Sequence, residues 1–232
     1  MNNEGQVRFD NGNPLPKKYA ATYLGNEINR EVNIKHEVLN KMQEVRKIWF
    51  KWAPYWRASN ANQKWQLIIF DAVILSKLLY GLETVHLTNA LLKKVDAFQL
   101  RCLRKILKMA PTFVDRSNTN TAVIQKASSI AYPDRNNPRS IQLFSIHYNE
   151  KRAELLGHII RTSDADPLRQ ISLEAQSANR VQYGKKRCGR PRQNWLHHTK
   201  KYIYECKLNH HSYEEGPVDD NHIYNAALQR SF

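Results

Sequence analysis

Residues 89–109 read NALLKKVDAFQLRCLRKILKM, and this stretch decides the fold class. Its apolar side chains recur every three or four residues, which is the period of an α-helix. They are Leu91, Leu92, Val95, Phe98, Cys102, Leu103, Ile106 and Leu107. Thr88 stands immediately before the stretch and belongs to the residue types that cap helix N-termini. The pattern predicts an amphipathic helix that buries one stripe, with Cys102 on the buried side.

Two further helical patterns precede this helix. The apolar spacing in residues 31–57 is again helical, and Pro54 is expected to end or kink that helix. Its basic residues, among them Lys41 and Arg46, are expected on the opposite, polar face. Residues 61–83 are apolar on more than one side and should be buried between neighbours, with Asn60 as the N-cap. Together these patterns predict a mainly α protein with a compact helical bundle at residues 31–110.

The segments before and after the bundle have different sequence patterns. Residues 1–30 read as a short β-hairpin, in which strands near residues 7–9 and 19–25 are joined by a turn at Asp10-Asn11-Gly12-Asn13. Residues 111–138 are polar and rich in turn signals, so we expect a linker with one short helix at residues 121–128. A second helical segment is expected at residues 139–210, with helices at 139–162, 167–177 and 193–205, followed by a polar tail at 211–232.

The charge balance indicates a polyanionic partner. The chain has 232 residues, with 36 Lys and Arg against 21 Asp and Glu, and a formal net charge of +15. Such a surplus favours nucleic acid. The three cysteines lack Cys-x-x-Cys spacing and suit a reducing compartment, and no apolar run is long enough for a membrane span. No targeting segment is visible, so we expect a nuclear or cytoplasmic protein, with an organelle as the alternative.

A basic loop is expected after the predicted helix at residues 167–177. It holds six positive charges in thirteen residues with no acidic residue among them: Arg180, Lys185, Lys186, Arg187, Arg190 and Arg192. Phosphate neutralisation by such a loop makes binding salt-dependent. Its Gly189-Arg190-Pro191-Arg192 also resembles the core of AT-hooks, which enter the A·T minor groove. The alternative is a solvated loop without a ligand.

A second basic surface is expected on the bundle. Its candidate phosphate contacts are Lys47, Lys51, Arg101, Arg104 and Lys105. Aromatic side chains can stack on bases next to such a surface. Trp49, Trp52 and Trp65 fall on helical apolar positions, however, so we expect them in the core.

Metal binding and catalysis have little support in the sequence. Cys206 and His210 have the spacing of half a zinc site, and Cys188 is the weak candidate for a third ligand. Solvent-facing histidines are the alternative, and no cofactor is expected. The acidic residues Asp71, Glu83 and Asp96 stand singly, without the paired carboxylates that hold catalytic metal ions.

Five short blocks occur in a distinctive order. They are Tyr23-Leu24-Gly25, the run from Leu78 to Thr84, Phe98-x-x-x-Cys102-Leu103-Arg104, Leu156-Gly157-His158 and Gly189-Arg190-Pro191-Arg192. In this order they resemble the C-terminal region of reverse transcriptases from non-LTR (LINE-type) retrotransposons, which comprises the palm end, the thumb and a linker region. The similarity spans about residues 7–197.

This resemblance implies a thumb-like bundle and RNA or an RNA–DNA duplex as the ligand. No Ala-Asp-Asp-type turn precedes Tyr80, so the catalytic aspartates of the family's palm are missing. We therefore expect a non-catalytic nucleic-acid-binding protein derived from such an enzyme. The alternatives are a recruited structural subunit of a large ribonucleoprotein such as a ribosome, the thumb portion of an RNA-directed DNA polymerase that works with a separate palm, and a relic without a role.

Overall fold

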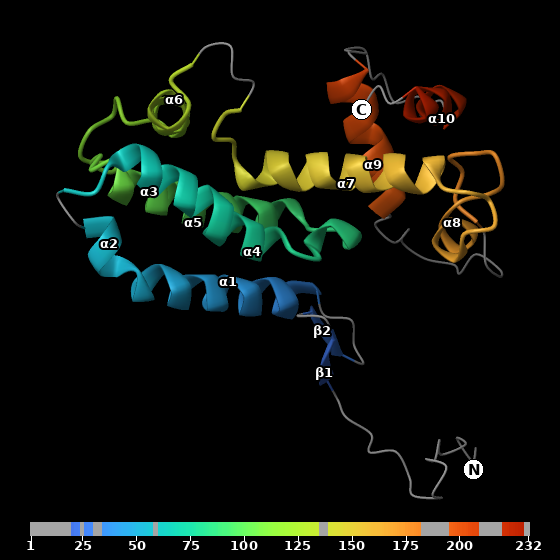
Figure 1. The fold of residues 1–232 in the computed structure, drawn as a ribbon, viewed down its shortest axis with the longest axis horizontal. Helices are drawn as coiled ribbons and strands as arrows, with labels where there is room; N and C mark the ends of the chain where they lie inside the picture. The colour runs from blue at the N-terminus through green and yellow to red at the C-terminus, as the bar shows by residue number, and fades with distance from the viewer. Residues whose placement is uncertain are drawn as a thin grey trace, which may run out of the picture.

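The computed structural model describes residues 20–23, 26–29, 34–57, 60–134, 139–181, 195–208 and 220–229. These ranges are mainly helical, which confirms the predicted fold class. Helices α1, α5 and α7 form successive layers of the molecule, and α6 lies across the top of α3 and α5 (Figure 1). No helix in these ranges combines the length and the apolar character needed to cross a bilayer.

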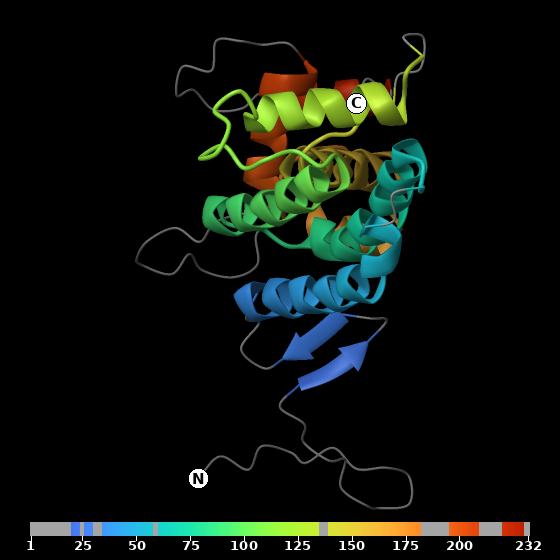
Figure 2. The same ribbon diagram turned by 90° about the vertical axis from the view of Figure 1, so that its left-hand side faces the viewer.

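A two-stranded antiparallel sheet precedes the helices, but it is not the hairpin that the sequence predicts. Strand β1 (Ala20–Tyr23) pairs with β2 (Asn26–Asn29), with Ala20 opposite Asn29. The prediction paired residues 19–25 with an earlier strand, and that strand and its turn lie outside the described residues. The pairing seen joins segments only two residues apart in sequence, the shortest connection that antiparallel strands allow. The two strands project away from the helical layers (Figure 2).

Helix α1 (Ile34–Lys51) places its predicted apolar stripe in the core. The helix ends before Trp52, and Pro54 stands in the first turn of α2 (Ala53–Arg57), where its missing N–H is tolerated. The predicted break at Pro54 is therefore confirmed. The ring of Trp49 is buried and stacks on Trp56, with 4.9 Å between ring centroids.

Lys41 departs from the polar face on which it was expected. Its side chain is buried, and its Nζ donates to the carbonyl oxygen of Tyr80 at 2.5 Å and lies 5.5 Å from the centre of the Tyr80 ring. Burial lowers the pKa of Lys41. The lysine thus links α1 to the end of α4, because its long stem can lie along apolar surface while its amine finds a backbone acceptor.

The predicted helix at residues 61–83 is a continuous run in three parts. These are α3 (Gln63–Ile69), the π-helical η1 (Phe70–Leu75) and α4 (Ser76–Leu79). The N-cap is Asn62, whose side chain accepts from the N–H of Lys64. The predicted N-cap, Asn60, was therefore wrong by two residues. Gly81 follows with φ of 74°, a left-handed conformation that glycine adopts without a Cβ clash, and leads into the short η2 (Leu82–Thr84).

Helix α5 (Asn89–Ile106) agrees closely with its prediction. Thr88 caps it by accepting from the N–H of Leu91, and the predicted stripe, including Cys102, is buried except for Leu92, which is partly buried. The segment expected as a linker contributes more than a connection. Within residues 111–138, α6 (Asn120–Ala131) packs on α3 and α5 and buries Val123, Ala127 and Ala131 in the first hydrophobic cluster. Two alanines give little apolar signal in sequence, yet they let helices approach closely.

Helix α7 (Phe144–Arg161) runs through two hydrophobic clusters. Phe144 and Tyr148 belong to the first cluster with the bundle, and Leu156 and Ile160 belong to a second. The second cluster is completed by four elements that follow α7. Three of them are α9 (Trp195–Tyr202), the π-helical η3 (Ile203–Lys207) and α10 (Asp220–Leu228), and the fourth is the segment after α8 (Pro167–Ser172), which contributes Leu173 and Ala178. Asp166 caps α8 with Pro167 in its first turn, but the helix ends at Ser172, five residues before the predicted end at residue 177.

A buried polar joint connects the two clusters. The hydroxyl of Tyr148 accepts from the N–H of Leu87 at 2.9 Å and donates to the carbonyl of Val85 at 2.5 Å. The guanidinium of Arg152 donates to the carbonyl of Trp195 at 2.6 Å. The indole N–H of Trp195 in turn donates to the carbonyl of Glu83 at 2.6 Å. The segment after α4 is therefore bound to both α7 and α9.

Candidate nucleic-acid interface

A group of positive charges lies on the exposed side of α5. Lys93, Lys94, Arg101 and Lys105 are all exposed, and we call them the α5 basic face. At about 100° of rotation per residue they fall within roughly 120° around the helix, and they extend about 18 Å along it. The opposite side of α5 carries the core stripe. The amphipathic pattern that builds the bundle therefore also aligns these charges.

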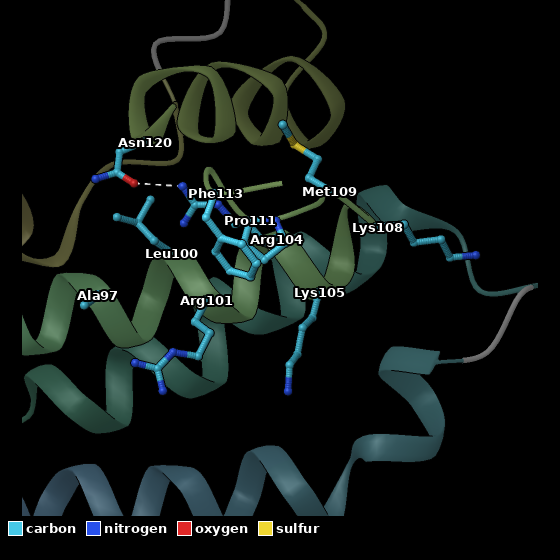
Figure 3. A pocket seen from close by; sticks show the side chains of 10 residues that line it. All are labelled: Ala97, Leu100, Arg101, Arg104, Lys105, Lys108, Met109, Pro111, Phe113 and Asn120. Carbon is cyan, nitrogen blue, oxygen red and sulfur yellow. Dashed lines mark hydrogen bonds between the residues drawn. The ribbon is translucent and has the colours of Figure 1, made fainter. Parts of the chain in front are cut away.

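A cavity of about 600 Å³ opens beside this face, and we call it the first cavity. Its apolar lining consists of Ala97, Leu100, Met109, Pro111 and Phe113. Its polar lining consists of Arg101, Arg104, Lys105, Lys108 and Asn120. Figure 3 shows the ring of Phe113 near α5, while Arg101 and Lys105 extend to the side on which α1 lies. The volume falls in the range of small-ligand sites.

A second, smaller cavity of about 120 Å³ lies between α5 and α1. Arg101 and Lys105 line it as well, so the same two cations stand between the two cavities. On the α1 side it is lined by Arg46, Trp49 and Phe50. The guanidinium of Arg46 lies 5.8 Å from the centre of the Phe98 ring. No acidic residue of the described chain lines either cavity.

Arg104 makes hydrogen bonds within the protein that the sequence did not predict. Its Nη2 donates to the carbonyl of Asn118 at 3.1 Å and to Oδ1 of Asn120 at 2.8 Å, and it lies 3.5 Å from Oγ1 of Thr112. The bond to Asn120 is the dashed line in Figure 3. The guanidinium of Arg104 thus holds the loop at residues 110–119 on α5, and the phosphate contact predicted for it stays a prediction.

Helix α5 ends in a Schellman motif. The N–H of Met109 bonds to the carbonyl of Arg104 at 2.9 Å, and the N–H of Lys108 bonds to the carbonyl of Lys105 at 3.4 Å. The motif requires a left-handed residue after the C-cap, a position that glycine usually occupies. Lys108 occupies it with φ of 54°. Lys108 lines the first cavity, and its exposed side chain extends away from the ring of Phe113 (Figure 3).

The structure brings only part of the predicted site together. Arg101 and Lys105 lie side by side in both cavities. Lys47 and Lys51 are exposed on α1, but they line neither cavity. Arg180 is exposed and forms an isolated antiparallel β-bridge with Leu173. Leu173 belongs to the second hydrophobic cluster, whereas the core residues of α5 belong to the first. The remaining basic-loop residues lie outside the described residues: Lys185, Lys186, Arg187, Arg190 and Arg192.

Several residues of the interface were not selected from the sequence. Lys93 and Lys94 could have been found from their helical spacing to Arg101. Arg46 could have been found only as one of many charges on the polar face of α1. Phe113 carried no such signal, because its segment reads as a polar linker. It is 88 % exposed, and Phe50 is 63 % exposed.

The prediction that three tryptophans lie in the core is confirmed for one of them. Trp49 is buried, whereas Trp52 is 37 % exposed and Trp65 is 57 % exposed. Helix α3 is apolar on several sides, but its neighbours cover only some of them. Neither exposed tryptophan lines the two cavities beside α5.

Only one of the three candidate metal ligands lies within the described residues. Cys206 is exposed, while Cys188 and His210 lie outside the described residues. Among the residues that the structure describes, no group of three His, Cys, Asp or Glu is placed to hold a metal ion. Burial raises the pKa of the Cys102 thiol to about 12, so this cysteine is a core residue rather than a nucleophile.

The three acidic residues that stand singly in the sequence lie in contacts between elements or in partly buried positions. Oδ1 of Asp96 accepts from the N–H of Ser145 at 2.9 Å, which joins α5 to the start of α7. Burial raises the pKa of Asp71, and the nearby His147 opposes that shift. The carbonyl of Glu83 accepts from the indole of Trp195.

Comparison with known proteins finds no matching family model, no matching curated protein and no matching solved structure.

Proposed function

We propose that this protein is a non-catalytic nucleic-acid-binding protein and that its contact surface is the α5 basic face with the two cavities beside it. One observation carries the proposal. Arg101 and Lys105 are exposed between two cavities, one with Phe113 in its wall and the other with Phe50. Cations that follow a phosphate backbone, next to aromatic rings that meet bases, are the two components of single-strand and RNA recognition.

The charge of the whole chain supports the same proposal. A net charge of +15 raises the local concentration of any polyanion, and the α5 basic face is a defined place for it to dock. The loop with Lys185, Lys186, Arg187, Arg190 and Arg192 adds further candidate phosphate contacts in the sequence. The resemblance to LINE-type reverse transcriptases makes RNA or an RNA–DNA duplex the first ligand to try.

Charge reversal on α5 tests the proposal. Binding of a fluorescently labelled 20-nucleotide RNA to the full chain is measured by anisotropy at fixed moderate salt. We expect Arg101→Glu/Lys105→Glu to lower affinity at least about tenfold, because both phosphate contacts are lost and two repulsions replace them.

A matched variant controls for net charge. Lys77→Glu/Lys151→Glu changes the charge by the same amount at two exposed lysines on α4 and α7, and it disturbs only surface ion pairs with Glu44 and Glu154. This control should retain most of the affinity. Equal losses in the two variants, or no RNA binding by the unmodified protein, would overturn the proposal.

A further inference from the structure

The first cavity combines an apolar interior with a cationic rim. Leu100, Met109 and Pro111 provide apolar surface, while Arg101, Lys105 and Lys108 provide positive charge. A purely apolar ligand would leave the cations without a counter-charge, and a free phosphate would leave the apolar surface wet. The lining matches a ligand with a flat apolar part and a directly attached anion, which is the chemistry of a nucleotide.

Phe113 is presented by a well-anchored loop. Besides the bonds from Arg104, Nδ2 of Asn118 donates to the carbonyl of Ala110 at 3.0 Å. The N–H groups of Val114 and Asp115 both donate to the carbonyl of Pro111, at 2.9 and 3.0 Å. The ring is nevertheless almost fully exposed. An exposed aromatic ring on an anchored loop can stack on a base without the cost of ordering the loop.

Lys108 gives a second indication of a ligand. A left-handed conformation costs a non-glycine residue about 1–2 kcal/mol, and glycine would avoid that cost at this position. The lysine instead keeps a charge on the rim of the cavity at some expense in stability. Such backbone outliers gather at binding sites.

We propose that the first cavity receives one unpaired base of a single-stranded nucleic acid. The base stacks on Phe113 over Leu100 and Met109, and the phosphates on either side of it contact Arg101, Lys105 and Lys108. The inference rests on the proposed function and specifies its ligand. A base inside a duplex is already stacked on its neighbours, so only an unpaired nucleotide can enter without an unstacking cost.

The test compares two aromatic truncations on two ligands. Phe113→Ala removes the proposed stacking platform, and Phe50→Ala removes the ring on the other side of Arg101 and Lys105, which is 63 % exposed. Binding of the full chain to a 12-nucleotide single-stranded RNA and to a blunt 12-base-pair RNA duplex is measured by anisotropy. Neither side chain belongs to the core, so both variants should fold; circular dichroism confirms it.

We expect Phe113→Ala to lose roughly five- to one-hundredfold in affinity for the single strand. Its affinity for the duplex should stay unchanged, and Phe50→Ala should lose less than Phe113→Ala on the single strand. Equal single-strand affinity of Phe113→Ala and the unmodified protein would overturn the inference, and so would an equal loss on both ligands. If the unmodified protein binds neither RNA, the proposed function itself fails, which is a distinguishable outcome.

Discussion

Lys108 combines a left-handed backbone conformation with a place in the lining of the first cavity. Its backbone closes the end of α5 in a left-handed conformation, and its charge lies on the rim of the first cavity. We expect Lys108→Gly to raise the free energy of unfolding by up to about 1 kcal/mol, because the Cβ clash is removed. Urea unfolding measures this change.

Lys108→Ala is the control for that substitution. It removes the same charge but retains a Cβ, so it should show no such gain in stability. Both variants should bind RNA more weakly than the unmodified protein. Equal unfolding free energies of the glycine and alanine variants would contradict the account of Lys108.

The surroundings of a residue can be predicted from the sequence only where they depend on its neighbours in the chain. The burial of Cys102 follows from its place in a helical stripe, which is local information. The burial of Lys41 does not, because its acceptor on Tyr80 lies 39 residues further along the chain. The role of Arg104 likewise depends on a loop that folds back from Asn118 and Asn120.

At the scale of elements, α7 ties the two hydrophobic clusters together through Tyr148. We expect Tyr148→Phe to lower the free energy of unfolding by about 1–3 kcal/mol, because the N–H of Leu87 and the carbonyl of Val85 would lose their partner in a buried place. Thermal and urea unfolding measure the loss. Tyr80→Phe is the matched control at a tyrosine that is 55 % exposed, and its effect should stay within about 0.5 kcal/mol. Equal effects of the two variants would argue against the joint.

The elements differ in how well the sequence predicts them. Helix α5 is predictable to within a few residues, because its cap and its apolar period agree. Helix α6 was expected only as a short helix inside a linker, since Ala127 and Ala131 become core residues only through the close approach of α3 and α5. The structure pairs residues 20–23 with residues 26–29, a pairing that the sequence did not predict, while the strand and turn predicted at residues 7–13 lie outside the described residues and stay a prediction.

At the scale of the whole molecule, the contact between the two clusters should depend on pH. The rings of His86 and His198 stack with 4.2 Å between their centroids. Burial lowers the pKa of His198, and the neighbouring charges of His86, His197, Arg152 and Lys201 lower it further. The folded protein therefore binds fewer protons at this site than the unfolded chain does. The contribution of neutral His198 to the free energy of unfolding is complete above about pH 6.5, the ordinary pKa of histidine. It is lost as the pH falls below that value.

Urea midpoints between pH 7.5 and 5.5 test this dependence. We expect His198→Gln to show a smaller fall in stability on acidification than the unmodified protein. His158→Gln, at an exposed histidine on α7, should retain the original dependence. Identical pH profiles for His198→Gln and the unmodified protein would contradict the proposed sensitivity.

The central claim for the molecule is that nucleic acid docks on the α5 basic face. The most direct measurement is the salt dependence of single-stranded RNA binding by the unmodified protein, by Arg101→Gln/Lys105→Gln and by the control Lys77→Gln/Lys151→Gln. A plot of log Kobs against log salt should lose about 1.4 in the magnitude of its slope for the α5 variant, which is about 0.7 for each lost phosphate contact. The control should keep the original slope. Equal slopes for the α5 variant and the unmodified protein would contradict the claim.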